Sequence, residues 1–220
     1  MRTHRLSPLV YIKEEWLYTV NLVPGEKVYT EKLHQEDTTE YRSWNPYKSK
    51  LAAGILNGLQ HFPFTETSVI LYLGAASGTT ASHLSDICTK GLVYCVEFSP
   101  RTARELVYTC EKRKNMIPIL KDASQPETYA DLITAVDIIY QDLAQPNQSE
   151  ILKRNFIFLK ENGYAFMCIK SRSIDVAAEP KNVFKKEAKF LRTFVHIEER
   201  IPLEPYEKDH LMIVGKNLLK

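Results

Sequence analysis

The stretch that decides the fold is Leu71-Tyr-Leu-Gly-Ala-Ala-Ser-Gly-Thr-Thr80. An apolar strand over Ser68–Leu73 leads into a turn with Gly74 and Gly78, and a helix is expected from about Thr79. A strand, a glycine turn and a helix in this order form the nucleotide site of parallel α/β sheets. Glycine permits both the tight turn and a close approach by a ligand, and the first N–H groups of the helix face polar or anionic ligand atoms. The stretch therefore predicts a small-molecule site.

Two common phosphate-binding motifs are missing from this turn. A P-loop has the pattern GxxxxGK[ST], but no lysine lies between Gly74 and Thr80. A dinucleotide fingerprint has the pattern GxGxxG, but Gly74 and Gly78 are four positions apart with no third glycine. Both phosphate interpretations are weakened, and a redox dinucleotide enzyme becomes a distant alternative.

Acidic residues follow the next three predicted strands. The strands and their acids are Leu92–Val96 with Glu97, Met116–Leu120 with Asp122, and Val136–Tyr140 with Asp142. Open α/β sheets bind ligands at the carboxyl ends of their strands. Glu97 lies close to the offset of about 20 residues at which an acid meets ribose hydroxyls, and Asp122 could accept from an adenine amino group. Ribose and adenine recognition without a phosphate cradle favours S-adenosylmethionine, with Asp142 beside its cationic sulfonium. The alternative is that each acid caps a helix or is solvated.

Bulk properties set broad limits on the function. The chain has 220 residues, 44% hydrophobic and 25% charged, which fits one globular domain with a small appendage. A net charge of +2 confines any nucleic-acid role to a local patch. No apolar run approaches the roughly 18 residues of a membrane span, and no signal-peptide pattern follows Met1.

Cysteine and histidine spacing predicts neither disulfides nor a metal site. The scattered cysteines lack CxxC spacing and are expected to be buried thiols in a reducing compartment: Cys88, Cys95, Cys110 and Cys168. The six histidines form no HExxH pair.

The chain is predicted to have two parts, a small antiparallel β subdomain at residues 1–47 and an α/β domain at 48–220. Strands expected in the first part are Leu9–Lys13, Trp16–Asn21, Lys27–Leu33 and Glu40–Trp44, with turns at Pro24-Gly25 and Gln35–Thr39. Further helices are expected at Lys48–Gln60, from Ser99-Pro100 onward, and at Pro126–Thr134, Ser149–Leu159 and Pro180–Thr193. Later strands are expected at Tyr164–Ile169, Phe194–Ile201 and His210–Val214, the last two forming an antiparallel hairpin. Seven strands with interleaved helices predict a Rossmann-like sheet.

Methyl transfer is an in-line displacement that requires an aligned nucleophile and removal of its proton. Lys170 follows the strand Tyr164–Ile169 and should rise from the same edge as Asp142. It acts as a base only if burial or nearby cations lower its pKa; protonated, it would stabilise developing oxygen charge. His210 could relay a proton or be structural, and Lys50 by itself has the pattern of a surface lysine. Whether Lys170 or Asp142 takes the proton stays open.

Two basic clusters are compatible with RNA contacts, although solvated faces are the alternative for both. In the first cluster, cations surround aromatic side chains, an arrangement suited to RNA: Arg42, Trp44, Tyr47, Lys48 and Lys50. The second occupies one predicted helix and includes Lys181, Lys185, Lys186, Lys189 and Arg192.

From about Asn21 onward the chain resembles the fibrillarin family, the S-adenosylmethionine-dependent RNA 2′-O-methyltransferases of box C/D ribonucleoproteins. The glycine turn alone fits many methyltransferases, but its combination with the later motifs is specific. Besides the turn, the matching motifs are Asn21-Leu-Val-Pro-Gly25, Trp44-Asn-Pro-Tyr-Lys-Ser-Lys50, Val96-Glu-Phe-Ser-Pro-Arg101, Asp142-Leu-Ala-Gln-Pro146, Ile169-Lys-Ser-Arg-Ser-Ile-Asp175 and Leu203-Glu-Pro-Tyr-Glu-Lys-Asp-His210.

The resemblance implies a seven-stranded S-adenosylmethionine-dependent methyltransferase sheet with a small antiparallel β N-terminal subdomain. It implies a catalytic set of Lys50, Asp142, Lys170 and His210, with no metal. Donor contacts are expected from the glycine turn and the strand ends: Gly74, Ala75, Gly78, Thr79, Thr80, Glu97, Phe98, Asp122, Ala123, Asp142, Leu143, Ala144 and Gln145.

The resemblance also implies partners. A box C/D guide RNA would pair with the target rRNA or tRNA, a Nop-family scaffold and a kink-turn-binding ribosomal-like protein would complete the assembly, and no membrane is involved. The 8 glycines include none before Gly25, so the Gly/Arg-rich extension of eukaryotic members is missing. An archaeal-type protein in the cytoplasm is therefore expected. A stand-alone small-molecule O-methyltransferase using a divalent ion and a non-catalytic donor-binding scaffold remain alternatives.

Overall fold

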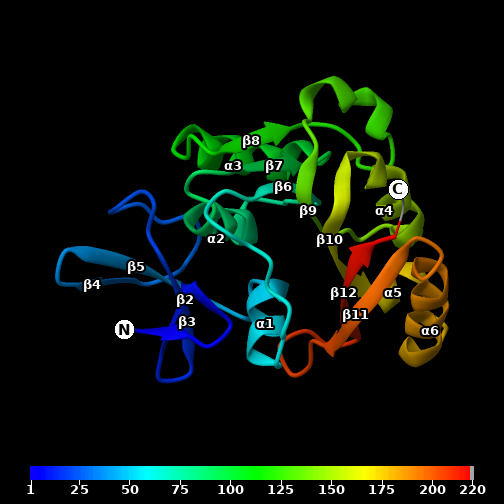
Figure 1. Cartoon of the computed structure of the whole chain (residues 1–220), viewed down its shortest axis with the longest axis horizontal. Helices are drawn as coiled ribbons and strands as arrows, with labels where there is room; N and C mark the ends of the chain where they lie inside the picture. Colours follow the sequence, from blue (N-terminus) through cyan, green and yellow to red (C-terminus); the bar gives the residue numbers. More distant parts are fainter. Residues whose placement is uncertain (219–220) are drawn as a thin grey trace.

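Two β-sheets organise the chain, and the computed structural model describes residues 1–218 (Figure 1). The first sheet is antiparallel, with strand order β1-β2-β3-β5-β4. Its strands are β1 (Arg2–His4), β2 (Ser7–Lys13), β3 (Trp16–Val20), β4 (Leu33–Glu36) and β5 (Thr39–Trp44). This sheet matches the expected N-terminal β unit in kind, but not in every strand.

The expected strand Lys27–Leu33 is wrong, and pairing instead begins at Leu33. The cause is Glu31, whose carboxylate accepts the backbone N–H groups of Val28 and Tyr29, both at 2.8 Å. These bonds curl the segment around a buried acid, so it cannot extend. The expected turn Gln35–Thr39 accordingly shrinks, because β4 runs to Glu36 and β5 starts at Thr39.

The second sheet has seven strands in the order β11-β12-β10-β9-β6-β7-β8, which confirms the predicted Rossmann-like class. Its strands are β6 (Val69–Leu73), β7 (Leu92–Val96), β8 (Met116–Ile119), β9 (Val136–Gln141), β10 (Leu159–Lys170), β11 (Val195–Pro202) and β12 (His210–Asn217). Strands β6 to β10 run parallel, while β12 is antiparallel to both β10 and β11. The predicted hairpin of the last two strands is confirmed, and β12 lies between β10 and β11.

The helices are α1 (Lys50–Leu56), α2 (Thr79–Ile87), α3 (Pro100–Glu111), α4 (Gln148–Asn155), α5 (Ser171–Ile174) and α6 (Pro180–Leu191). The expected helix Lys48–Gln60 is shorter because Ser49 caps its start and Gly58 follows its end at φ +98. The helix expected at Pro126–Thr134 is wrong. Two 3₁₀ turns, Pro126–Thr128 and Ala130–Leu132, replace it because Tyr129, at φ −139, turns inward to bond Asn155.

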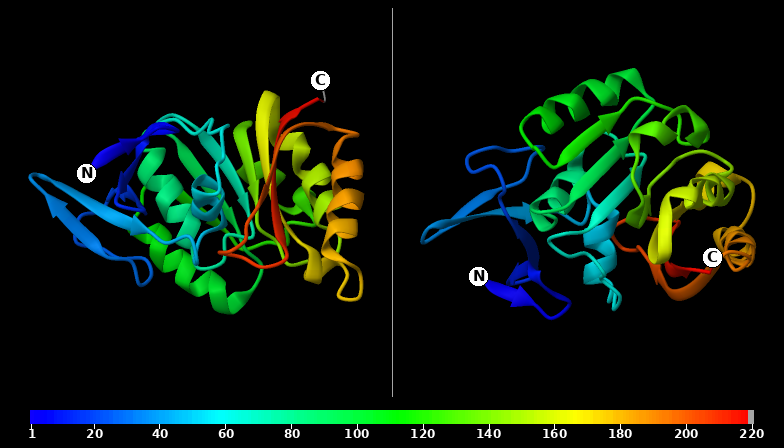
Figure 2. Two further views of the ribbon diagram at one scale, coloured as in Figure 1. Left: turned by 90° about the horizontal axis from the view of Figure 1, so that it is seen from below. Right: turned by 45° about the horizontal axis from the view of Figure 1, so that its top comes forward.

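Two cores cover the two faces of the large sheet, as the alternation of strand side chains requires. Helices α1, α2 and α3 pack on one face, together with Val10, Leu17 and Trp44 of the small sheet. Helices α4 and α6 pack on the other. Figure 2 shows the small sheet at one end of the molecule and α6 at the other. The small sheet thus joins a core shared with the helices that carry the site.

The four cysteines are buried free thiols, as predicted. Among the helices of residues 1–218, none is both long and apolar enough to cross a bilayer.

Candidate active site

The glycine turn lies where the carboxyl ends of β6, β7 and β9 meet. Gly74 and Ala75 donate backbone hydrogen bonds to Val96 at 2.9 and 3.1 Å, and Asp142 donates one to Leu73 at 2.9 Å. Gly74 has φ +81, and a Cβ there would lie 2.8 Å from the carbonyl oxygen of Asp142. Only glycine fits this position without displacing Asp142.

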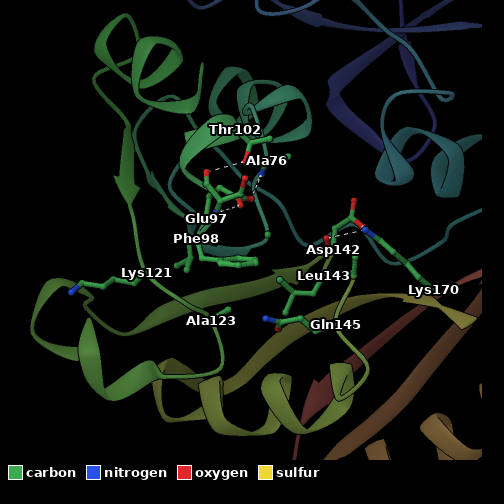
Figure 3. Close-up of a pocket in the computed structure, with 14 residues that line it drawn as sticks. Ala76, Glu97, Phe98, Thr102, Lys121, Ala123, Asp142, Leu143, Gln145 and Lys170 are labelled. Carbon is green, nitrogen blue, oxygen red and sulfur yellow. Dashed lines mark hydrogen bonds and ion pairs between the residues drawn. The ribbon is translucent and has the colours of Figure 1, made fainter. Parts of the chain in front are cut away.

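A cavity of about 250 Å³ opens beside this turn. It is bounded by the turn after β6, by residues at and after the ends of β7, β8 and β9, and by Lys170 at the end of β10, and Figure 3 shows the side chains around it. Of the residues predicted to contact a donor, those that line it are Gly74, Glu97, Phe98, Ala123, Asp142, Leu143, Ala144 and Gln145. Residues from five distant segments therefore converge on one hollow.

Glu97 and Phe98 give one end of the cavity the chemistry of a nucleoside site. The carboxylate of Glu97 accepts the N–H of Ala76 at 2.9 Å and that of Ser99 at 2.8 Å, one on each oxygen. These bonds fix the group and leave lone pairs for a vicinal diol. The Phe98 ring is 59% exposed, although large aromatic rings usually bury their faces. Both residues fit the ribose and adenine of S-adenosylmethionine.

Gln145 and Asp122 supply further polar groups near this end. Gln145 Nε2 donates to Asp122 Oδ1 at 3.5 Å, and the same oxygen accepts the N–H of Ser124 at 2.8 Å. Burial alone would raise the pKa of Asp122, but the bonds from Ser124 and Gln145 lower it below its ordinary value. Gln145 Oε1 is buried and has no hydrogen-bond partner in residues 1–218, so it is free to accept a hydrogen bond from a ligand.

Three predicted catalytic residues meet at the other end of the cavity, where Asp142 and Lys170 line it and Lys50 contacts Asp142 from outside the lining. Asp142 lies between two ammonium groups: Lys170 Nζ is 2.8 Å from Oδ1, and Lys50 Nζ donates to Oδ2 at 3.2 Å. The three side chains are only 13–19% exposed. Lys170 also donates to the backbone oxygen of Asp142 at 3.2 Å. The cluster can bind an oxygen nucleophile and stabilise its negative charge.

The electrostatics of the cluster fix its charge state. Burial alone would raise the pKa of Asp142, but the ammonium groups of Lys50 and Lys170 lower it below its ordinary value. Burial alone would lower the pKa of Lys50, but Asp142 and the more distant Glu207 raise it above its ordinary value. Asp142 therefore stays a carboxylate and Lys50 an ammonium at neutral pH, so Lys50 cannot accept a proton and Asp142 is a weak base.

His210 lies at the same edge but makes no hydrogen bond or ion pair with the other three residues within 1–218. It is paired with Lys170 across β10 and β12, and its ring Nδ1 donates to the carbonyl oxygen of Lys208 at 2.6 Å. The sequence reasoning missed Glu207, which lies 3.5 Å from Lys50 as a second counterion. Glu207 lies in the same motif as His210, Leu203–His210, and this position could have indicated that it belongs to the site.

The remaining predicted donor contacts do not line the cavity: Ala75, Gly78, Thr79, Thr80 and Asp122. Thr80 is buried and donates its hydroxyl to Ser49 at 2.9 Å, which ties α2 to the start of α1. Gly78 precedes α2 at φ +92, and no side chain caps the helix there. Roles for these five residues in donor binding stay predictions. Among residues 1–218, no group of three His, Cys, Asp or Glu side chains is placed to hold a metal ion.

Comparison with known proteins matches this arrangement to one family. The family model described as Fibrillarin matches residues 1–218. The chain belongs to the fibrillarin family. It is 55% identical over 210 residues to the fibrillarin-like rRNA/tRNA 2′-O-methyltransferase of Thermococcus onnurineus, with 93% of each chain covered.

Two solved fibrillarins share the fold closely. The Aeropyrum pernix fibrillarin, crystallised with natively bound S-adenosyl-L-methionine, superposes with a TM-score of 0.90 at 46% identity, covering 97% of this chain and 96% of that one. The fibrillarin of a fibrillarin/Nop5p complex superposes with a TM-score of 0.89 at 42% identity, covering 95% and 97%. Both confirm the methyltransferase sheet with its N-terminal extension of strands.

Proposed function

We propose that this fibrillarin-family chain is an RNA 2′-O-ribose methyltransferase that acts on rRNA, and also on tRNA, within a box C/D guide-RNA ribonucleoprotein. One observation carries the proposal: Asp142 and Lys170, with Lys50 paired to Asp142, lie at one end of a cavity whose other end holds Glu97 and the exposed Phe98. S-adenosylmethionine supplies an electrophilic methyl group on a sulfonium. The relatives' names and the bound donor of the Aeropyrum protein support the same assignment.

The chain's own residues account for the rest of the chemistry. Glu97 and Phe98 would hold the nucleoside end of the donor. The ionised Asp142 keeps the ammonium groups of Lys50 and Lys170 in place, and their positive charge would stabilise the negative charge that a ribose oxygen gains. Because Lys50 keeps its proton, it acts by position and charge rather than as a base. Lys170 and Asp142 remain the two groups that could receive the hydroxyl proton, directly or through solvent.

We also propose that the chain works within an assembly of protein and RNA partners. A Nop-family scaffold is a partner, by analogy with the fibrillarin that was crystallised with Nop5p. A guide RNA and a kink-turn-binding ribosomal-like protein complete the particle. The first basic cluster contributes little RNA affinity, because Arg42 and Trp44 are fully buried and only Tyr47 and Lys48 are exposed. The second basic cluster is exposed on α6. Few phosphate contacts give weak, salt-sensitive binding. A cytoplasmic location stays a prediction.

Transfer of tritiated methyl from S-adenosylmethionine to a guide-matched RNA tests the proposal. The chain would be assayed alone and then with scaffold, kink-turn protein and guide, as wild type and as Lys170→Ala. Methylation of one ribose, only in the full assembly and lost in the variant, is expected. Equal activity of the isolated chain without a guide would instead indicate a stand-alone O-methyltransferase. Donor binding without transfer in any assembly would indicate a non-catalytic scaffold.

A further inference from the structure

An aromatic pair lies directly outside the catalytic cluster. The rings of Tyr47 and Tyr206 meet edge to face, with centroids 5.1 Å apart and planes at 73°. Tyr47 precedes α1, and Tyr206 lies in the connection between β11 and β12, which runs beside α1 in Figures 1 and 2. The pair therefore bridges two segments from opposite ends of the chain.

The same two segments make a second contact closer to the site. Lys50, three residues after Tyr47, forms an ion pair at 3.5 Å with Glu207, which directly follows Tyr206. The contact thus has an inner ionic layer that reaches Asp142 and an outer aromatic layer. Neither tyrosine lines the donor cavity, so the aromatic layer lies outside the cluster, next to the Lys50–Glu207 pair.

The two tyrosines differ in their exposure to solvent. Tyr206 is partly buried and packs against the core that contains α1 and α2. Tyr47 leans on it but stays 58% exposed. Within residues 1–218 neither phenol hydroxyl makes a hydrogen bond, whereas the backbone N–H of Tyr47 donates to Asn45 Oδ1 at 2.9 Å. Tyrosine offers a large contact area at low entropy cost.

We infer that Tyr47, supported by Tyr206, is a positioning residue that packs against the sugar–phosphate backbone of the target RNA strand beside the methylated ribose. The inference rests on the proposed function. It adds Tyr47 to the residues that act on the RNA, although Tyr47 does not line the donor cavity. A guide–target duplex is A-form, and its wide, shallow minor groove displays the 2′-hydroxyls. A protruding tyrosine suits that surface, and the neighbouring exposed Lys48 is placed for a phosphate.

The test compares Tyr47→Ala and Tyr47→Phe with Tyr108→Ala in the full assembly. Tyr108 on α3 is the matched control because it is 59% exposed and lies away from the cavity that holds Asp142. With RNA saturating, Tyr47→Ala should slow single-turnover methyl transfer about tenfold, the loss of roughly one good contact. Tyr47→Phe keeps the ring and should lose less. Tyr108→Ala should stay within about twofold, and donor affinity should not change in any of the three variants.

A photo-crosslinking residue at position 47 identifies the molecule that contacts this position. With p-benzoylphenylalanine in place of Tyr47, irradiation should join the chain to the target RNA near the methylated nucleotide, and the same group in place of Tyr108 should not. A crosslink to the scaffold protein, a rate for Tyr47→Ala within twofold of wild type, or a loss explained by weaker donor binding would each overturn the inference. An inactive wild-type assembly would instead count against the proposed function.

Discussion

Lys50 Nζ donates a hydrogen bond to Asp142 Oδ2 at 3.2 Å, although 92 positions separate the two residues in the chain. The first turn of α1 makes this possible. Ser49 caps α1 by accepting from the N–H of Ala52, and its hydroxyl also accepts from Trp44 Nε1 and Thr80. The small sheet, α1 and α2 are thereby joined at one hydroxyl. The placement of Lys50 is a property of tertiary packing rather than of its own segment.

Replacing Asp142 by asparagine should abolish most methyl transfer. The amide keeps the shape of the side chain but leaves Lys50 and Lys170 without the charge that holds both ammonium groups at the cavity. We expect single-turnover transfer in the full assembly to fall at least about 100-fold, the usual scale for a group that acts on the reacting oxygen or its proton. Glu66→Gln is the control, because Glu66 forms an exposed ion pair with Lys90 away from the cavity. A drop of less than tenfold in Asp142→Asn would remove Asp142 from the reacting centre.

The charge state of the cluster predicts a pH-independent plateau. The pKa of Asp142 is lowered, so its contribution to stability is complete above the ordinary carboxyl value of about 3.9 and is lost as the pH falls through the folded value. The pKa of Lys50 is raised, so its contribution is complete below about 10.4 and is lost only as the pH rises through the folded value. Both charges should persist from pH 5 to 9 (about four units around neutrality).

Urea unfolding of wild type and Asp142→Asn measures this plateau. The difference between their free energies of unfolding should stay constant between about pH 6 and 8 and shrink below about pH 4. A difference that changes near neutrality would show that Asp142 titrates there. In the same range, any limb in the pH–rate profile should come from a group other than Asp142 or Lys50.

The carboxyl-edge residues were predictable because strand ends in a parallel sheet converge, whatever the sequence distance. The pattern of strands alone was enough to predict that Glu97 and Asp142 belong to the site. Lys50 was different: its own segment indicated a surface lysine, and only the family resemblance placed it in the site. Glu207 was missed because a counterion in an irregular loop has no periodic pattern. Glu31 likewise redirected the segment before β4 through side-chain bonds to backbone N–H groups, which alternation of apolar residues does not reveal.

A pair of glycine substitutions separates backbone strain from close approach at the turn. Gly74 and Gly25 have nearly the same dihedral, φ +81 and φ +84, but a Cβ at Gly25 would meet nothing within 4 Å. Gly25→Ala should therefore cost about 1–2 kcal/mol for the left-handed backbone alone. Gly74→Ala should cost more, because its Cβ would push against Asp142 and Leu143.

Donor binding measured by calorimetry completes this comparison. Gly74→Ala should weaken the affinity for S-adenosylmethionine at least about tenfold, whereas Gly25→Ala should leave it within about twofold. Equal affinities in the two variants would mean that the close contact between Gly74 and the Asp142 backbone does not shape the donor site.

The small sheet should depend on one buried carboxylate in α2. Asp86 accepts from Arg42 at 2.8 Å and from Arg113 at 2.6 Å, and also from Thr19 and the backbone of Leu22. The side chains of Asp86, Arg42 and Arg113 are at most 1% exposed. Removing one partner of a buried ion pair leaves uncompensated charge, so Asp86→Asn should lower the free energy of unfolding by about 3–5 kcal/mol.

Urea unfolding with Glu66→Gln as the control tests this dependence. Glu66 is 45% exposed and its partner Lys90 is 68% exposed, so that substitution should change the stability by less than about 1 kcal/mol. Asp86 does not line the donor cavity, so donor affinity should be kept below the melting temperature of Asp86→Asn. If Asp86→Asn were no less stable than Glu66→Gln, the two sheets would be held together by their shared apolar core alone, and the two buried arginines would need no carboxylate between them.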